Sequence, residues 1–152
     1  MNKKGFTLIE LLIVVAIIGI VAAIAIPNLL VALQKGKQKA TMGDLKSVGT
    51  ALEVYATDNS MIPNEASLVT LSGESYFIPF YIKVLPLQDG WGTAWDYAPG
   101  ANPSDQYAIT SYGRDKAVAS IALNYQVTAL SDFNNNITFS NGQFTLGPIV
   151  KK

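Results

Sequence analysis

The residue types in this sequence leave few routes to catalysis. The chain has no histidine and no cysteine, which excludes a Ser-His-Asp triad, a cysteine nucleophile and a histidine-based metal site. Glycine-rich phosphate loops and the Gly-x-Ser-x-Gly nucleophile elbow are also absent. An enzyme would have to use carboxylates, lysine or tyrosine alone, and no spacing among them indicates a site. We therefore expect no enzymatic activity.

One carboxylate has a position that needs an explanation. Glu10 is the only charged residue between Phe6 and Leu33, a stretch otherwise interrupted by Thr7, Pro27 and Asn28. A helix needs about 20 residues to cross about 30 Å of hydrocarbon, so this segment is long enough to span a membrane. A carboxylate inside the hydrocarbon is strongly unfavourable. Glu10 therefore either reaches the headgroups from the end of the helix or has a partner within the apolar layer.

The same segment has features of a secretory signal peptide, because basic residues precede an apolar core. The flank that a signal peptidase would need is poor. The run Ala-Ala-Ile-Ala at 22–25 is the nearest match to an Ala-x-Ala site, and the apolar residues continue past it to Leu30. Lysines lie on both sides of the segment, so the positive-inside rule does not set its orientation.

The residues around Glu10 form a more specific pattern. Lys3-Lys4-Gly5 is followed by Phe-Thr-Leu-Ile-Glu at 6–10 and then by about twenty apolar residues, a combination that resembles the type IV prepilin family. The resemblance implies that a prepilin peptidase cuts after Gly5 and that Phe6 becomes an N-methylated N-terminus. It also implies that, in a filament, the Phe6 ammonium and the Glu10 carboxylate of neighbouring subunits neutralise each other. Because either charge alone in an apolar bundle is unfavourable, the pair would set the register between subunits.

Gly19 and Pro27 lie within the apolar segment. Proline inside a helix removes one backbone hydrogen bond and clashes with the preceding turn. Filaments of the family that the sequence resembles commonly lose helical structure between the positions matching these two residues, which lets the rod extend. The alternative is a simple kink in a membrane helix, and the sequence fits both interpretations.

A second pattern indicates that the helix continues beyond the apolar segment. Spacings of three and four place four apolar residues on one helix face: Leu45, Val48, Leu52 and Tyr55. Asp-Asn-Ser at 58–60, followed by Pro63, predicts where the helix ends. The sequence thus predicts one nearly continuous helix from Phe6 to about Asn59, whose second half packs on a domain.

The remaining residues, to Lys152, have the composition of a small β-rich domain. A short helix is expected at 64–71. Strands are expected at 76–84 (bent or at an edge because of Pro79), 96–99, 107–112 and 118–127, and a final hairpin joins 137–139 to 143–146 across Ser-Asn-Gly. The predicted fold class is α+β: a long N-terminal α-helix, membrane-spanning in its first half, packed on a small, mostly antiparallel β-sheet domain.

Several motifs in the second half of the chain make the resemblance more specific. The chain contains Leu85-Pro86, Asp-Gly-Trp-Gly at 89–92, Tyr97 and Tyr-x-Ile-x-Ser-x-Gly-x-Asp at 107–115. With Ala-Leu-x-x-Tyr-x-x-Asp at 51–58, these motifs resemble the major pseudopilins of type II secretion systems, in which the second motif reads Asp-Pro-Trp-Gly. The resemblance covers about residues 1–115. The absence of cysteine fits a pseudopilin better than an adhesive pilin, whose C-terminal loop is usually closed by a disulfide.

One departure concerns calcium. In the pseudopilins that the sequence resembles, the Gly-x-Asp motif opens an acidic, glycine-rich loop that binds calcium, an ion that prefers six to eight oxygen ligands. Here no acidic residue lies between Asp115 and Asp132, and Arg114 and Lys116 add positive charge. Asp115 is a calcium candidate by resemblance alone, and its surroundings favour a turn residue. The aromatic residues of these motifs are expected to pack in the core and turns: Trp91, Tyr97, Tyr107 and Tyr112.

These resemblances imply a division of the chain into a prepilin leader (1–5), a transmembrane and assembly helix (6–33), an amphipathic continuation (34–60) and a β-rich domain (61–152). They imply a structural subunit of a helical homo-oligomeric filament, most like the major pseudopilin that drives protein export. Before assembly it would cross the inner membrane once, with its domain in the periplasm. Its partners would be a prepilin peptidase and an inner-membrane platform with a separate ATPase, since the chain has no nucleotide motif.

Two other interpretations remain. The chain could be a type IV pilin of a surface filament used in adhesion, motility or electron transfer, or, from another class, a membrane-anchored binding module. Nucleic acid is not an expected partner, because 11 basic residues balance 11 acidic ones.

Overall fold

The computed structural model describes residues 5–65, 67–74, 76–99, 106–117, 126–127 and 132–148. The chain falls into two compact units, residues 1–34 and residues 35–152. Its elements, in chain order, are α1 (Leu8–Asn59), α2 (Leu68–Ser72), β1 (Asp96–Pro99), β2 (Tyr107–Ser111), β3 (Gln126–Val127), β4 (Ile137–Ser140) and β5 (Gln143–Gly147). A long helix followed by a mostly antiparallel sheet confirms the predicted α+β class.

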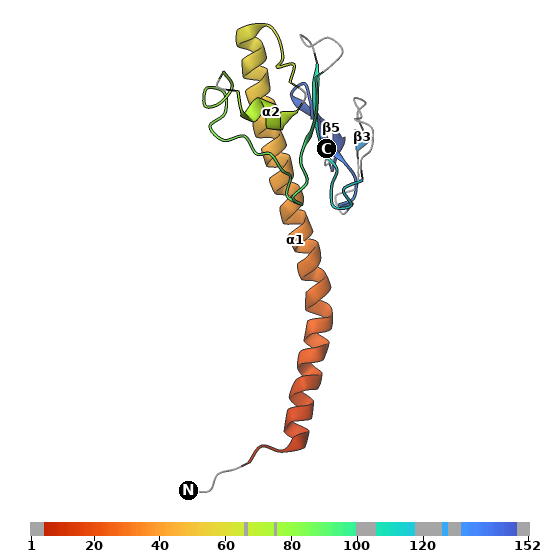
Figure 1. Cartoon of the computed structure of the whole chain (residues 1–152). Helices are drawn as coiled ribbons and strands as arrows, with labels where there is room; N and C mark the ends of the chain where they lie inside the picture. Colours follow the sequence, from red (N-terminus) through yellow and green to blue (C-terminus); the bar gives the residue numbers. More distant parts are fainter. Residues whose placement is uncertain are drawn as a thin grey trace. The chain divides into compact units, whose positions relative to one another are not determined.

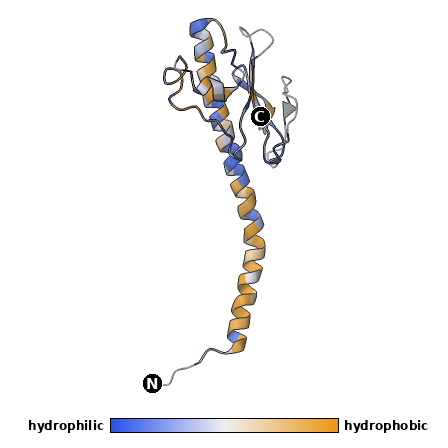
Figure 2. Cartoon of the chain, in the orientation of Figure 1, coloured by the Kyte–Doolittle hydropathy of each residue, from blue (hydrophilic) through white to orange (hydrophobic). Residues whose placement is uncertain are grey.

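Helix α1 runs without interruption from Leu8 to Asn59 (Figure 1). It begins two residues after the expected start at Phe6 and ends where the sequence predicts. The Asn59 side chain donates to the Tyr55 carbonyl at 3.0 Å, and Ser60 has a φ of 56°, a left-handed conformation that ends helices. Figure 2 shows that the first half of α1 is almost entirely hydrophobic, whereas polar residues become frequent in the second half.

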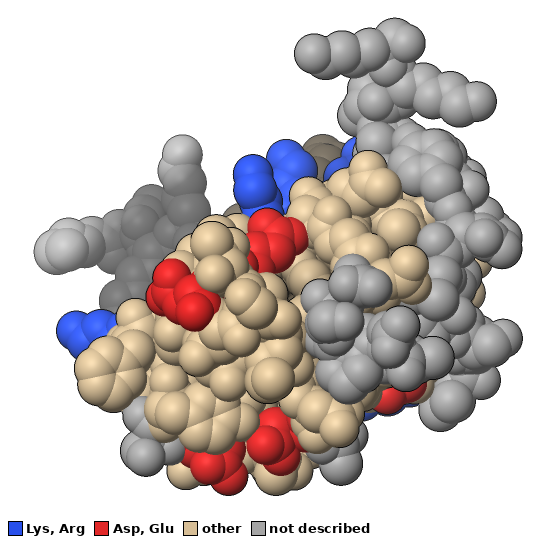
Figure 3. Space-filling view, turned by 90° about the horizontal axis from the view of Figure 1, so that it is seen from above, with Lys and Arg blue, Asp and Glu red and all other residues tan. Residues whose placement is uncertain are grey.

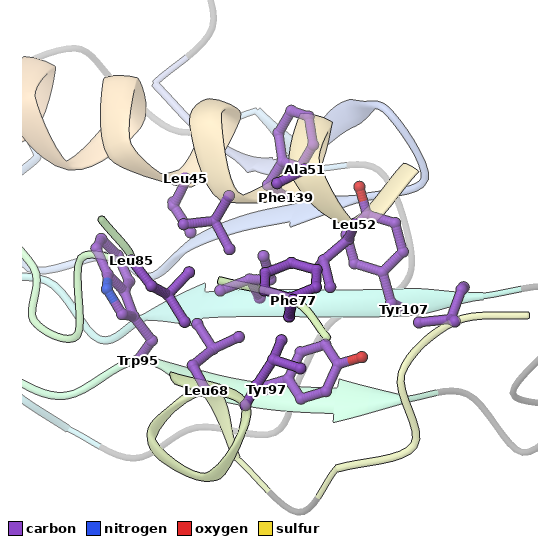
Figure 4. Packing of buried hydrophobic residues seen from close by; sticks show 14 of the residues in the cluster. Leu45, Ala51, Leu52, Leu68, Phe77, Leu85, Trp95, Tyr97, Tyr107 and Phe139 are labelled. Atoms are coloured by element: carbon purple, nitrogen blue, oxygen red, sulfur yellow. The ribbon is translucent and has the colours of Figure 1, made fainter. Parts of the chain in front are cut away.

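The apolar stripe predicted in the second half of α1 is the face that enters the core. Leu45, Val48 and Leu52 are buried, and Tyr55 is partly buried against the same cluster. Figure 4 shows Leu45 and Leu52 on the side of the helix that faces Phe77. Each fully buried aliphatic side chain contributes about 1.5–3 kcal/mol, so this stripe holds residues 45–55 onto the domain.

The strands form one sheet in the order β1-β2-β4-β5-β3. All neighbouring strands are antiparallel except β3 and β5, which are parallel. Ile109 on β2 lies opposite Tyr97 on β1 and Phe139 on β4, and all three side chains belong to the core cluster. Since paired residues share a face of the sheet, this face meets the core.

The hairpin of β4 and β5 forms where the sequence predicts it. Asn141 and Gly142 have φ angles of 47° and 82°, and two consecutive positive φ angles are what a type I′ reversal requires. Asn141 also accepts a hydrogen bond at Oδ1 from the Tyr107 amide at 3.2 Å. The turn therefore holds the start of β2 as well as closing its own hairpin.

The prediction of a strand at 76–84 is wrong. These residues form turns, in which the Tyr81 amide donates to the Phe77 carbonyl at 3.0 Å and the Ile78 amide donates to the Glu74 carbonyl at 3.2 Å. Such local bonds use the backbone groups that a strand would offer to a neighbour. Proline at 79 has no amide to offer.

The short helix expected at 64–71 is α2, which begins later than predicted. The Ser67 hydroxyl caps it by accepting from the Thr70 amide at 3.2 Å, as serine commonly does at helix starts. The strands predicted at 96–99 and 107–112 are β1 and β2. Of the strand predicted at 118–127, only residues 126–127 are described, and they form β3.

Candidate assembly and processing site

The helix that contains Glu10 begins with a reciprocal pair of hydrogen bonds. The amide and hydroxyl of Thr7 donate to Glu10 Oε2 at 2.8 and 2.6 Å, and the Glu10 amide donates to Thr7 Oγ1 at 3.3 Å. This is a capping box, in which two residues three apart satisfy each other's backbone amides at a helix start. This role of Glu10 is not among the predictions made from the sequence, although Thr-x-x-Glu before an apolar run is the known signal of a capping box.

The capping box fixes where the negative charge lies. A carboxylate in the first turn of a helix interacts favourably with the helix dipole. Both bonds from Thr7 end on Oε2, and Oε1 accepts no hydrogen bond from the described part of the chain. The Glu10 side chain is exposed, so one of its oxygens is available to a cation outside the chain.

The surface that follows Glu10 is apolar on every side. Each large apolar side chain from Phe6 to Leu33 is exposed, with exposed fractions between 44% and 86%. The helix is long and apolar enough to cross a membrane by length and composition. An exposed apolar surface of this extent marks a site of contact with lipid or with other protein chains.

Gly19 and Pro27, the predicted helix breaks, both lie inside the continuous helix α1. A Cβ on Gly19 would meet no atom of this chain within 4 Å. Glycine in a helix costs about 1 kcal/mol relative to alanine, and no packing within the described chain compensates for it. No contact within the described chain therefore requires a glycine at this position.

In the second unit, the residues of the Asp-Gly-Trp-Gly motif surround a buried carboxylate. Asp89 Oδ1 accepts from the amides of Trp91 and Thr93 at 2.9 and 2.8 Å, and Oδ2 accepts from the Ser111 hydroxyl at 2.6 Å. Asp89 is only 6% exposed. Buried carboxylates are stable when hydrogen bonds replace their water, so Asp89 joins its own loop to the end of β2.

The next residue joins the same loop to α1. The Gly90 amide donates to Thr41 Oγ1 at 2.9 Å, and that hydroxyl donates to the Lys37 carbonyl at 2.9 Å. A Cβ on Gly90 would lie 2.6 Å from the Lys37 oxygen. Glycine is therefore needed here, because it allows two backbones to approach this closely.

The motif tyrosines each donate their hydroxyl to another part of the domain. Tyr97 donates to the Pro63 carbonyl at 2.6 Å, and Tyr112 donates to Asp96 Oδ2 at 2.5 Å. Tyr107 lies close to the carbonyl of Gly49 (3.1 Å) and to Glu53 Oε1 (3.0 Å), both on α1. These side chains are buried, which confirms the prediction that they pack in the core. Trp91 is partly buried against that core.

These contacts make the domain sensitive to alkaline pH. Burial raises the pKa of Tyr97 and, together with the Glu53 carboxylate, that of Tyr107. Burial and then the hydrogen bond to Asp96 raise the pKa of Tyr112 to about 12. Unfolded tyrosine has a pKa of about 10. Since the folded pKa is the higher one, this contribution to stability is complete below pH 10 and is lost as pH rises toward and beyond 12.

We therefore expect the free energy of unfolding to fall above about pH 10 as these tyrosines ionise preferentially in the unfolded chain. When unfolding is followed at pH 11, phenolate absorbance should rise in a step, because the buried tyrosines ionise as the chain unfolds. The variant Tyr112→Phe should show a smaller step. Titration of all seven tyrosines near pH 10 in the folded protein would contradict this prediction.

The calcium candidate, Asp115, lies in a turn at 113–116. Its Oδ1 accepts from the Ala117 amide at 3.1 Å, and Lys116 has a φ of 57°. Within the described ranges, no group of three acidic side chains is close enough to hold a metal ion. The hydrogen bond to Ala117 is the usual role of aspartate in a turn.

Comparison with known proteins gives two matches to family models. The model described as "Prokaryotic N-terminal methylation motif" matches residues 1–26. The model described as "Type II secretion system (T2SS), protein G" matches residues 28–129, which is more than half of the chain. The chain belongs to the type II secretion system protein G family.

Curated relatives in this family carry the name "Type II secretion system core protein G". The protein from Pseudomonas aeruginosa is 34% identical over 125 residues, which cover 75% of this chain and 87% of the relative. The Vibrio cholerae protein is 38% identical over 108 residues, covering 65% and 73%. The Escherichia coli K12 protein is 32% identical over 125 residues, covering 75% and 83%.

The two matched ranges contain both groups of residues described above. The methylation motif includes Gly5, Phe6 and Glu10, and the protein G match includes the Asp89 loop with β1 and β2. The protein G family is one of structural pseudopilins. The resemblance seen in the sequence up to about residue 115 is therefore confirmed, and the family match extends to residue 129.

Proposed function

We propose that this chain is the major pseudopilin of a type II secretion system, a structural subunit that polymerises through its N-terminal helix into a filament that drives protein export. The observation that supports this most is the start of α1. A single exposed carboxylate, oriented by the capping box with Thr7, stands at the start of a helix whose first part, to Leu33, is apolar on all sides.

The N-terminal residues are first processed and then take part in assembly. A prepilin peptidase removes residues 1–5 by cutting after Gly5, and Phe6 is then N-methylated. In the filament, the Phe6 ammonium pairs with Glu10 of a neighbouring subunit. Oε1 of Glu10 is suited to this because the box with Thr7 uses the other oxygen.

The ion pair matters because apolar packing alone gives little net free energy for moving the helix from the membrane into the filament. Lipid tails are as apolar as leucine, so a helix gains little by exchanging lipid for neighbouring helices. An isolated carboxylate is unfavourable in hydrocarbon, whereas a paired one is tolerated. Glu10 therefore favours the filament over the single helix, and a separate cytoplasmic ATPase acting on an inner-membrane platform supplies the remaining work.

The same proposal assigns the parts of the chain. Residues 1–5 are the leader, 6–33 the transmembrane and assembly helix, 34–60 its amphipathic continuation and 61–152 the periplasmic domain of a single-pass inner-membrane protein. Gly19 and Pro27 are the positions where the helix yields during assembly. The subunit has no catalytic role and binds no nucleic acid. The second point rests on the balance of 11 basic and 11 acidic residues, and Figure 3 shows side chains of both signs on the face that it draws.

The intact mass of the protein from its native membrane tests the proposal. We expect the mass of the chain without Met1–Gly5, plus one methyl group. The variant Gly5→Arg should keep its full length, because the peptidase acts at a glycine boundary in the family that the sequence resembles. A full-length, unmodified wild-type mass would reject the proposal. Cleavage near residues 22–25 would instead indicate an ordinary signal peptide.

A further inference from the structure

The two ends of the connection between β2 and β4 are joined directly to each other. The Arg114 amide donates to the Phe133 carbonyl at 2.8 Å, and Arg114 Nε donates to Asn134 Oδ1 at 2.9 Å. Arg114 therefore holds the segment 132–136 with both its backbone and its side chain. A charged donor makes a stronger hydrogen bond than a neutral one.

The neighbouring glycine shows how closely these ends pack. Gly113 has a φ of 71°, and a Cβ on it would lie 2.8–3.0 Å from the carbonyl oxygens of residues 133, 134 and 135. The Gly113 amide donates to Ser111 Oγ at 3.2 Å, and Ser111 donates to Asp89. The contact between the two ends is thus continuous with the buried carboxylate of the Asp89 loop.

Both acidic side chains at these ends are engaged locally. Asp132 Oδ1 accepts from the Asn134 amide at 3.2 Å, and Oδ2 accepts from Asn135 Nδ2 at 2.8 Å. Asp115 Oδ1 accepts from the Ala117 amide at 3.1 Å. These bonds hold the two carboxylates in separate turns, each within its own end of the connection.

The charges at these ends also differ from those of a calcium site. Asp115 and Asp132 contribute two negative charges, Arg114 and Lys116 contribute two positive charges, and residues 117–131 contain no acidic residue. The sum is zero, whereas calcium sites bind through several carboxylates that attract the ion. The residues present therefore do not fit the calcium ion that the resemblance to pseudopilins implies.

We propose that Arg114 closes the connection between β2 and β4 in place of a metal ion, so that this pseudopilin folds and keeps its stability without calcium. The guanidinium on one end supplies from within the chain a positive charge that binds the Asn134 side-chain oxygen on the other end. This inference concerns the second unit only and does not depend on the proposed filament function.

The test measures thermal unfolding of the full chain in detergent micelles by circular dichroism, with saturating calcium chloride and with excess EGTA. We expect the same Tm in both conditions and no binding of calcium by titration calorimetry. An increase of several degrees in Tm with calcium would overturn the proposal, and loss of that increase in Asp115→Asn would place the ion at this turn. This comparison uses the wild-type protein and does not depend on whether any variant folds.

Variants of the turn test the role of the arginine itself. Arg114→Ala should lower the Tm by about 2–4 °C in both conditions, and Arg114→Lys should recover only part of the loss because it lacks Nε. Lys116→Ala is the matched control: it removes the same charge from an exposed position in the same turn and should leave the Tm unchanged. Equal Tm values for Arg114→Ala and Lys116→Ala would overturn the assignment of Arg114.

Discussion

Replacing Glu10 with glutamine is expected to reduce filament assembly by at least about tenfold, because the substitution removes the charge that pairs with the Phe6 ammonium. Glutamine can still take part in a capping box, so the helix start should persist. The monomer should stay folded and in the membrane. The measurement is the amount of filament sheared from cells or assembled in a reconstituted membrane, relative to total subunit.

The structure offers a matched control in Thr7→Val. This variant removes the hydroxyl that bonds to Glu10 Oε2 but keeps the carboxylate charge. If the charge is what matters, Thr7→Val should assemble better than Glu10→Gln. The capping box is the competing explanation: if it alone mattered, Glu10→Gln would assemble normally and Thr7→Val would fail. If Glu10→Ala left the function of the protein intact, the helix would be only an anchor and the membrane-anchored binding module would be favoured instead.

The second large effect is expected at Gly90. In Gly90→Ala, the new methyl group would lie 2.6 Å from the Lys37 carbonyl oxygen and 3.0 Å from Thr41 Oγ1. The first of these atoms belongs to helix backbone and cannot turn away as a flexible side chain would. Overpacking of this kind costs about 1–3 kcal/mol, and separation of the loop from α1 would add the loss of the hydrogen bond between Gly90 and Thr41. We expect a loss of about 3 kcal/mol in the free energy of unfolding.

Denaturant unfolding of the full chain in micelles would measure this loss. Gly43→Ala is the control, because Gly43 is exposed on the same helix and a Cβ there would meet nothing within 4 Å. That variant should be more stable than wild type by about 0.5–1 kcal/mol. A Gly90→Ala variant as stable as wild type would show that the loop does not lie against α1 as described.

The parts of the fold that the sequence predicts correctly are those set by neighbouring residues. The stripe of Leu45, Val48 and Leu52 follows helical spacing, and the turn at Asn141-Gly142 needs positive φ angles that these two residue types favour. Both signals lie within a few residues of the structure that they specify. The strand predicted at 76–84 failed because aromatic and β-branched composition does not distinguish a strand from turns that bury the same side chains.

The contacts that define the sites are less accessible from the sequence. Glu53 is not one of the apolar residues that mark the buried face of α1, yet its carboxylate accepts a hydrogen bond from the hydroxyl of Tyr107, 54 residues away. The link from Asp89 to Ser111 spans 22 residues. The resemblance groups these motifs without indicating which residues bond to each other, because the partners are far apart in the sequence and meet only in the folded domain. The Thr7–Glu10 box was predictable in principle, since its three-residue spacing is a local signal.

The strand order has a consequence for how the protein is made. β5 (Gln143–Gly147) lies between β4 and β3, so it is an interior strand although it is the last strand in the described part of the chain. During synthesis, β3 and β4 emerge before the strand that separates them. Until residue 147 has been made, β3 and β4 both lack the strand that joins them, and unpaired strand edges are the templates on which chains aggregate. The sheet can therefore be completed only after its last described strand has been synthesised, and before that point the incomplete chain is exposed to aggregation.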